Sequence, residues 1–139
     1  MSGALAGRTA IITGASRGLG AEIARAFWDA GASLFLVARS DRGLADLQAS
    51  LISDSTRQAI LFPADLADEQ TPSRIVAAAL AALKRVDILV NNAAIQGPIG
   101  PAWENDWAGW KTTIQVDLLA PVALCRRCLH CVSACPTMA

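Results

Sequence analysis

Three glycines with the spacing Gly14-x3-Gly18-x-Gly20 are the residues of this sequence best suited to binding a charged ligand. A short apolar run precedes them and a stretch with helical apolar spacing follows, which favours strand, turn and helix over a flexible loop. Such a turn offers backbone N–H groups and the positive end of a helix dipole to a phosphate. We expect Gly14 to permit the turn, Gly18 to let a pyrophosphate approach, and Gly20 to let the helix pack closely on its strand. The spacing therefore predicts a dinucleotide phosphate site.

The charges after the second expected strand bear on which dinucleotide would bind. An acidic residue about 20 positions beyond the glycine turn would bind the ribose 2′-OH of NAD, whereas this sequence has Ala38-Arg39-Ser40. Arg39 could pair with the 2′-phosphate of NADP, and Arg17 could approach the same phosphate from the other side. Alternatively both arginines are ordinary solvated charges, and the nearby Asp41 weakens the case. We favour NADP(H) over NAD(H).

Strand and helix patterns alternate along the chain, as a parallel sheet covered by helices requires. The expected strands cover residues 9–13, 33–38, 58–62 and 88–90, and the expected helices cover 17–30, 41–52, a segment from 71 and a segment from 106. Gly31 suits a helix C-terminus, and Thr71 and Pro72 suit a capping hydroxyl followed by a proline at the first helical position. Residues 96–108 read as a loop. The fold class is α/β, a Rossmann-type doubly wound parallel sheet.

Composition limits the classes of protein to which this chain can belong. The 139 residues suit one domain, and 53% hydrophobic against 17% charged residues argue against disorder. The formal net charge of zero argues against a nucleic-acid or anionic-membrane partner. No apolar run reaches the roughly 20 residues of a membrane span, and the N-terminus lacks the features of a signal peptide. We expect a soluble, cytoplasmic protein.

Three motifs together resemble those of the short-chain dehydrogenase/reductase family. They are the glycine turn after Thr13, the pair Asp65-Leu66 after an apolar run, and Asn91-Asn92-Ala93-Ala94 after the strand 88–90. The resemblance covers roughly residues 8–124 and implies strand order 3-2-1-4 in an incomplete sheet. It implies cofactor contacts at Gly14, Ser16, Arg17, Gly18, Leu19, Gly20, Arg39, Asp65, Leu66, Asn92 and Ala93.

The catalytic residues that the family uses are mostly missing from this sequence. Members reduce carbonyls or oxidise alcohols with a tyrosine, a lysine four residues later, a serine and an asparagine. The sequence has no tyrosine, its lysines, Lys84 and Lys111, stand in other contexts, and Asp117 occupies the asparagine position. The resemblance implies an NAD(P)-dependent oxidoreductase present as its cofactor-binding portion, whose full-length relative acts on a small carbonyl or alcohol. The alternative is a non-catalytic NADP-binding or regulatory fragment.

All four cysteines lie near the C-terminus, in the run Cys125-x2-Cys128-x2-Cys131-x3-Cys135-Pro136. This spacing equals a bacterial ferredoxin run, so iron–sulfur binding, or zinc binding with His130, is a second alternative. The run continues a helical pattern, however, which suits a cluster poorly. We therefore expect no metal site, a partial Rossmann domain over 1–124, and a cysteine-rich tail over 125–139 foreign to the fold. A frameshift or truncation near Leu124 would give such a tail.

Two further expectations concern surfaces. Trp103, Trp107 and Trp110 are interpreted as packing residues rather than a substrate-stacking group. Residues 88–90 would form a bare sheet edge, and Leu118 and Leu119 would lack neighbours to bury them. We therefore expect the chain to self-associate, with a homo-oligomer as one form.

Overall fold

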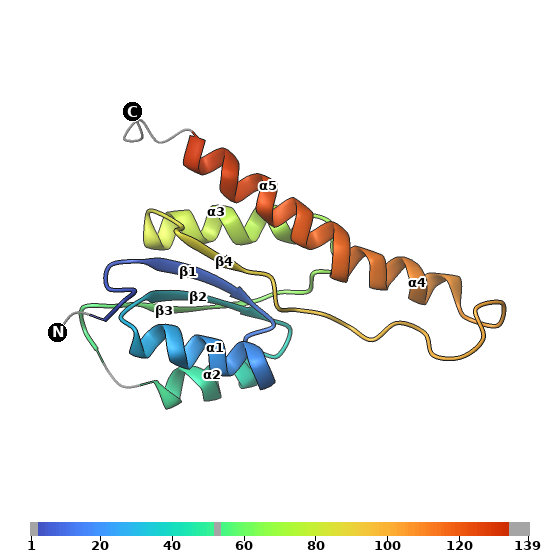
Figure 1. Ribbon diagram of the computed structural model, residues 1–139, viewed down its shortest axis with the longest axis horizontal. Coiled ribbons are helices and arrows are strands. Elements are labelled where there is room, and N and C mark those ends of the chain that lie inside the picture. The colour runs from blue at the N-terminus through green and yellow to red at the C-terminus, as the bar shows by residue number, and fades with distance from the viewer. Residues whose placement is uncertain (1–2, 52–53, 134–139) are drawn as a thin grey trace.

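The computed structural model describes residues 3–51 and 54–133, with side chains up to 129, and alternates strands with helices as expected. The first half contains β1 (Thr9–Thr13), α1 (Gly18–Asp29), β2 (Ser33–Ala38), α2 (Asp41–Ser50) and β3 (Ala59–Pro63). The second half contains α3 (Thr71–Leu83), β4 (Ile88–Val90), α4 (Trp107–Ile114), the π-helical turn η1 (Gln115–Leu119) and α5 (Ala120–Ser133). The last three run on as one helix (Figure 1).

The four described strands form one parallel sheet in the order β3-β2-β1-β4, which confirms the predicted topology. In the register of the sheet, Ile11 of β1 lies beside Phe35 of β2 and Leu89 of β4. β1 and β2 are central and buried almost throughout, because helices cover both faces of a parallel sheet. β4 lies at the edge and is only half-buried, also as expected.

Helices cover the two faces of the sheet, α1 and α2 on one and α3 and α5 on the other (Figure 1). Each face has its own buried apolar cluster. Leu124 of α5 and Ile75 of α3 belong to the second cluster and are fully buried. Burial of each such side chain stabilises the fold by roughly 1.5–3 kcal/mol, so α5 is held to the sheet by its packing.

Helix ends show where the local sequence determines the backbone. Gly31 follows α1 with φ +100°, the left-handed conformation that suits glycine. Asp106 caps α4, because its carboxylate accepts the N–H groups of Ala108 and Gly109.

The predicted cap at Thr71 is wrong. Gln70 is the N-cap of α3 and Thr71 is already helical and fully buried. A turn at Asp68 makes the entry to the helix instead: its carboxylate accepts the Gln70 N–H (2.9 Å) and its carbonyl accepts the Thr71 N–H (3.0 Å). The Thr71 hydroxyl is used elsewhere, as the acceptor of a hydrogen bond from the guanidinium of Arg74 at 2.8 Å.

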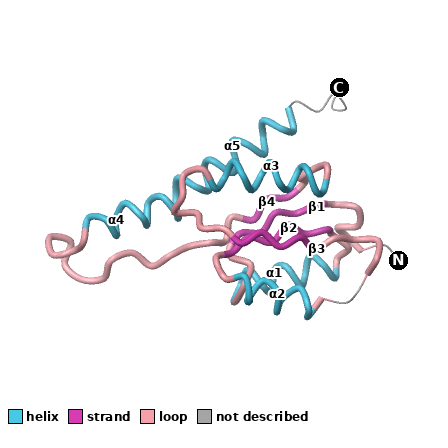
Figure 2. The backbone as a smooth tube through the Cα atoms, turned by 180° about the vertical axis from the view of Figure 1, so that it is seen from behind, coloured by secondary structure: helices cyan, strands magenta, loops and turns pink. Residues whose placement is uncertain are grey.

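α4 projects beyond the sheet as an arm with no buried residue (Figures 1 and 2). The expectation that the three tryptophans pack is wrong in this chain, since Trp103, Trp107 and Trp110 are 85%, 69% and 38% exposed. Trp107 and Trp110 lie on α4, whereas Trp103 lies in the turn before it, and no described helix or strand covers any of the three. Leu118 and Leu119 are exposed as well, as expected.

The cysteine segment begins inside α5, which continues past Leu124 to Ser133 without a break. Cys125 is exposed, while Cys128 is half-buried against the second apolar cluster. The side chains of His130 and Cys131, and the whole of Cys135, lie outside the described residues. Within the described part, no three His, Cys, Asp or Glu side chains gather as metal ligands. None of the described helices has the length and apolarity to cross a membrane.

Candidate cofactor-binding site

The glycine turn connects β1 to α1 in a conformation that its glycines make possible. Gly14 and Gly18 have φ of +66° and +56°. A Cβ on Gly14 would lie 2.8 Å from the Cα of Ala93, and one on Gly20 would lie 2.3 Å from the carbonyl oxygen of Gly14. A Cβ on Gly18 would meet nothing within 4 Å. The first and third glycines therefore pack against the protein, and the second borders open space.

Thr13 and Asn92 hold this turn against the end of β4. The buried Thr13 hydroxyl accepts the N–H groups of Asn92 and Ala93, both at 3.1 Å, and donates to the carbonyl of Val90 at 3.3 Å. The Asn92 side-chain amide donates back to the carbonyls of Thr13 (3.0 Å) and Gly14 (3.2 Å). Asn92 thus supports the wall of the site by shaping the turn.

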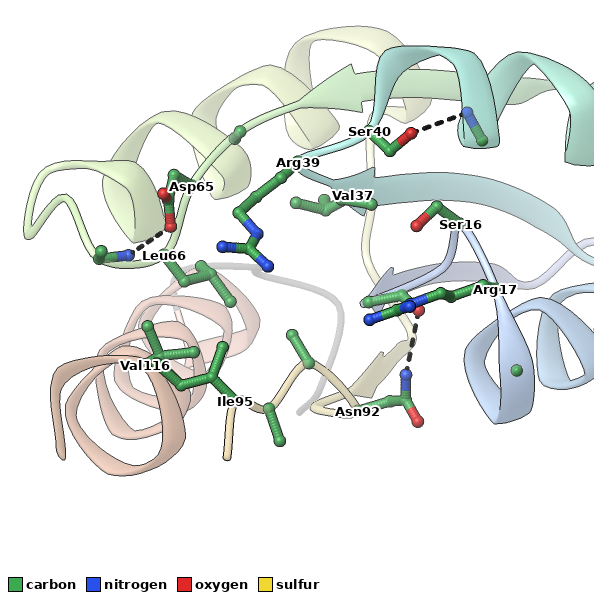
Figure 3. Close-up of a pocket in the computed structure, with 18 of the residues that line it drawn as sticks. Ser16, Arg17, Val37, Arg39, Ser40, Asp65, Leu66, Asn92, Ile95 and Val116 are labelled. Carbon is green, nitrogen blue, oxygen red and sulfur yellow. Dashed lines mark hydrogen bonds between the residues drawn. The ribbon is translucent and has the colours of Figure 1, made fainter. Parts of the chain in front are cut away.

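A cavity of about 630 Å³ opens beside the turn, at the carboxyl ends of the strands (Figure 3). Ligands of open parallel sheets bind at this edge. The cavity is lined by the end of β2, the segments that follow the four strands, the starts of α1 and α2, and two residues of the long helix: Gly14, Ser16, Arg17, Gly18, Val37, Ala38, Arg39, Ser40, Gly43, Ala64, Asp65, Leu66, Ala67, Asn92, Ala93, Ala94, Ile95, Thr112 and Val116.

Two arginines supply the positive charge of the cavity. Arg17 and Arg39 both extend into it, from the glycine turn and from the end of β2 (Figure 3). Within the described residues, neither takes part in an ion pair, whereas six other arginines do. Asp41 does not line the cavity and instead begins α2. The cavity therefore offers two unneutralised guanidinium groups to an anion.

The amino end of α1 adds to this positive potential. Arg17 is the N-cap residue with an extended backbone, and its side chain does not cap the helix. The helix thus starts at Gly18 with no side-chain acceptor from its own cap, directly beside the cavity. An anion placed there would meet the positive end of the helix dipole.

The opposite end of the cavity is apolar. Leu66 and Val116 are buried, and Figure 3 shows them gathered with Ile95 on one side of the space. Asp65 beside them accepts the N–H of Ala67 at 2.9 Å, so its carboxylate shapes the turn after β3 while it lines the cavity. A planar ring would fit an apolar slot of this kind.

Most predicted cofactor contacts meet at this cavity, and three predicted site residues do not. Leu19 is exposed and Gly20 is buried in the turn, and neither lines the cavity. Asp117 also lies outside the lining, on η1, where its carboxylate accepts the backbone N–H of Ile95 at 2.9 Å.

Sequence reasoning missed several lining residues, among them Ile95, Thr112 and Val116. The helical spacing of Thr112 and Val116, four residues apart, would have placed them on one face. No pattern in the neighbouring sequence indicates that Ile95 lines the cavity. Ser40, which follows Arg39, also lines the cavity, and its hydroxyl caps α2 by accepting the Gly43 N–H at 3.0 Å.

Comparison with known proteins agrees with this geometry. Residues 8–134 match the family model described as short chain dehydrogenase. The chain is 33% identical over 121 residues to an L-fucose dehydrogenase of Oryctolagus cuniculus, covering 87% of this chain and 41% of that protein. It is 40% identical over 115 residues to a rhamnolipid-biosynthesis 3-oxoacyl-[acyl-carrier-protein] reductase of Pseudomonas aeruginosa, covering 82% of this chain and 43% of that protein. The chain thus spans less than half of either relative.

Solved structures show the same fold. A metagenomic short-chain oxidoreductase in complex with NADP superposes with a TM-score of 0.86 and 35% identity, covering 94% of this chain and 58% of that one. An L-sorbose reductase of Gluconobacter frateurii, complexed with NADPH and L-sorbose, gives 0.84 and 28%, covering 94% and 49%. With its parallel sheet, its glycine turn and a family match over most of its length, the chain belongs to the short-chain dehydrogenase family.

Proposed function

We propose that this chain binds NADP(H) in the cavity beside the glycine turn, as the cofactor-binding portion of an oxidoreductase acting on a small carbonyl or alcohol. The observation that carries the proposal is the pair Arg17 and Arg39, two cavity-lining guanidiniums outside every ion pair of the described residues. Relatives that bind NADP or NADPH support the choice of cofactor.

Each part of the cavity suits one part of the dinucleotide. The open space at Gly18 and the uncapped start of α1 would hold the pyrophosphate. Arg39, with Arg17 opposite, would hold the 2′-phosphate through charge-assisted hydrogen bonds. The slot of Leu66, Ile95 and Val116 would take the adenine base. When bound, the nicotinamide would supply the hydride chemistry.

Titration of the nicotinamide fluorescence with the 139-residue chain tests the cofactor. We expect NADPH to bind more tightly than NADH and Arg39→Ala to erase most of the difference, about tenfold or more for a lost charge-assisted pair. Arg42→Ala is the matched control, because this arginine is 93% exposed and lies outside the cavity. Equal affinities for both cofactors would refute the NADP preference, and no binding of either would refute the cofactor proposal.

The second candidate is a cofactor-binding chain without turnover. It is favoured by the absence of tyrosine from the sequence, because a phenol beside a lysine is the proton donor that the family resemblance requires. We expect these 139 residues by themselves to match the uncatalysed rate with NADPH and a panel of ketones and aldehydes. Turnover that follows the protein through purification would contradict this and would require another proton donor.

A further inference from the structure

Gly43 is a glycine in the first turn of a helix, at a position where the backbone does not require one. It is the third residue of α2, its N–H donates to the hydroxyl of the N-cap Ser40 at 3.0 Å, and its φ is not positive. Glycine in a helix is less stable than alanine, because it loses more backbone freedom on folding. A reason other than backbone conformation must therefore favour glycine here, and the neighbouring glycine turn supplies it.

A side chain at Gly43 would collide with that turn. A Cβ at this position would lie 2.9 Å from the Cβ of Ser16, 3.2 Å from the carbonyl oxygen of Ser16 and 3.1 Å from the hydroxyl oxygen of Ser40. Carbon atoms in ordinary contact are about 3.5–4.0 Å apart, and the Cβ of Ser16 cannot rotate away because it is bonded to the backbone. The missing side chain thus lets α2 begin directly against the turn that follows β1.

Of the two segments in contact, the glycine turn is the more firmly held. Ala15, which precedes Ser16, is fully buried, and its N–H donates to the carbonyl of Val37 in β2 at 3.1 Å. The first two residues of α2, by contrast, are exposed. We expect a methyl group added at Gly43 to displace the start of α2, by about half an ångström if the two carbon atoms are to reach ordinary contact.

The start of α2 carries one side of the proposed phosphate subsite. Arg39 and Ser40 directly precede this helix and line the cavity opposite Arg17 (Figure 3). Gly43 and Ser16 line the same cavity. A displacement of α2 would therefore move Arg39 away from the turn that holds Arg17, and would widen the space between the two guanidinium groups.

We propose that Gly43 is a specificity-determining residue for NADPH, because it lets α2 begin close enough to the glycine turn for Arg39 and Arg17 to bind one phosphate. The inference rests on the proposed function, which assigns this end of the cavity to the 2′-phosphate. Charge-assisted hydrogen bonds from a guanidinium need a separation of about 2.7–2.9 Å, so a shift of Arg39 weakens them. NADH has no phosphate at this position, and its affinity depends much less on Gly43.

The first test compares NADPH with NADH by fluorescence titration of the 139-residue chain. We expect Gly43→Ala to weaken NADPH about fivefold and NADH less than about twofold. Ala45→Gly is the matched control, because it changes one methyl group at an exposed position of the same helix that does not line the cavity. It should leave the ratio of the two affinities unchanged.

The second test removes the atom that the new methyl group would meet. In Ser16→Gly the Cβ at 2.9 Å from the added methyl is gone, so the start of α2 need not move. Gly43→Ala made in this background should change the ratio of NADPH to NADH affinity by less than about twofold. Ser16→Gly by itself gives the reference, which separates the contact from any loss due to the Ser16 hydroxyl.

The outcomes distinguish this inference from the proposed function. If the unmodified chain prefers NADPH and Gly43→Ala keeps the full preference, the role of Gly43 is wrong and the choice of cofactor stands. An equal loss of preference from Gly43→Ala with and without Ser16→Gly would also overturn this role, because the effect would then arise within α2. Equal affinities of the unmodified chain for NADPH and NADH would refute the NADP preference itself, and this inference with it.

Discussion

Adding one methyl group at Gly20 is the most informative test of the turn. In Gly20→Ala the new Cβ would lie 2.3 Å from the Gly14 carbonyl oxygen and 2.5 Å from Nδ2 of the Asn92 side chain. Neither neighbour is free to move. The Asn92 amide donates to the carbonyls of Thr13 and Gly14, and the Thr13 hydroxyl joins β1 to the end of β4.

The cost follows from these contacts. Forcing an extra methyl into a packed site costs about 1–3 kcal/mol, and breaking a hydrogen bond from the Asn92 amide costs about 1 kcal/mol more. We expect a loss of about 3 kcal/mol in the free energy of unfolding. With an unfolding entropy of about 2.1 cal/mol/K per residue, this lowers Tm of a 139-residue chain by about 10 °C.

Gly18→Ala is the control, because a Cβ there meets open space and only the left-handed backbone is strained. That strain costs about 1 kcal/mol, or about 3 °C in Tm. Thermal unfolding followed by circular dichroism under excess reductant measures both variants. The reasoning fails if both variants lose the same stability, since the close contact at Gly20 would then have no consequence.

Two further predictions concern stability and association. Asp87 is 9% exposed; burial opposes its ionisation, but hydrogen bonds from Arg85 and Thr9 hold the pKa of its carboxyl below its usual value. Its stabilising contribution is therefore fully present above about pH 4, the ordinary pKa of an aspartate in the unfolded chain. The contribution is lost as the pH falls through the lower pKa of this carboxyl in the folded protein. Asp87→Asn should cost about 2 kcal/mol at pH 7 and reduce the acid dependence measured by urea titration. For association, the exposed Trp107 and Leu118 should drive concentration-dependent self-association that Trp107→Glu with Leu118→Glu suppresses. Light scattering under reductant measures it, and a monomer of the unmodified chain at all concentrations contradicts it.

The sequence predicted the sheet well because its strands carry their own signals. The bounds of β1, β2 and β4 are those expected, since each is a continuous apolar run between polar or glycine residues. β3 begins and ends one residue later than expected, and α1 and α2 end before the expected residues. These differences arise at helix and strand ends, where one hydrogen bond decides the assignment.

The parts that sequence missed depend on contacts between distant segments. Thr71 has the side chain of a cap, but Gln70 is the N-cap of α3, and the turn at Asp68 leads into the helix. The spacing of the tryptophans suggested one helix face, but Trp103 lies in the turn before α4, and no described helix or strand covers Trp107 and Trp110. The π-helical turn has no signal of its own in the sequence, so neither the reach of Gln115 to Leu66 nor that of Asp117 to Ile95 could be expected.

The exposed arm α4 depends on its cap and on the rest of the long helix for its existence as a helix. α4 has eight residues and none is buried, and a helix of that length is marginal in water by itself. It persists because Asp106 caps its start and η1 continues it into α5, whose Leu124 is fully buried. The bonds from η1 to Leu66 and Ile95 hold the middle of this long helix at the cavity.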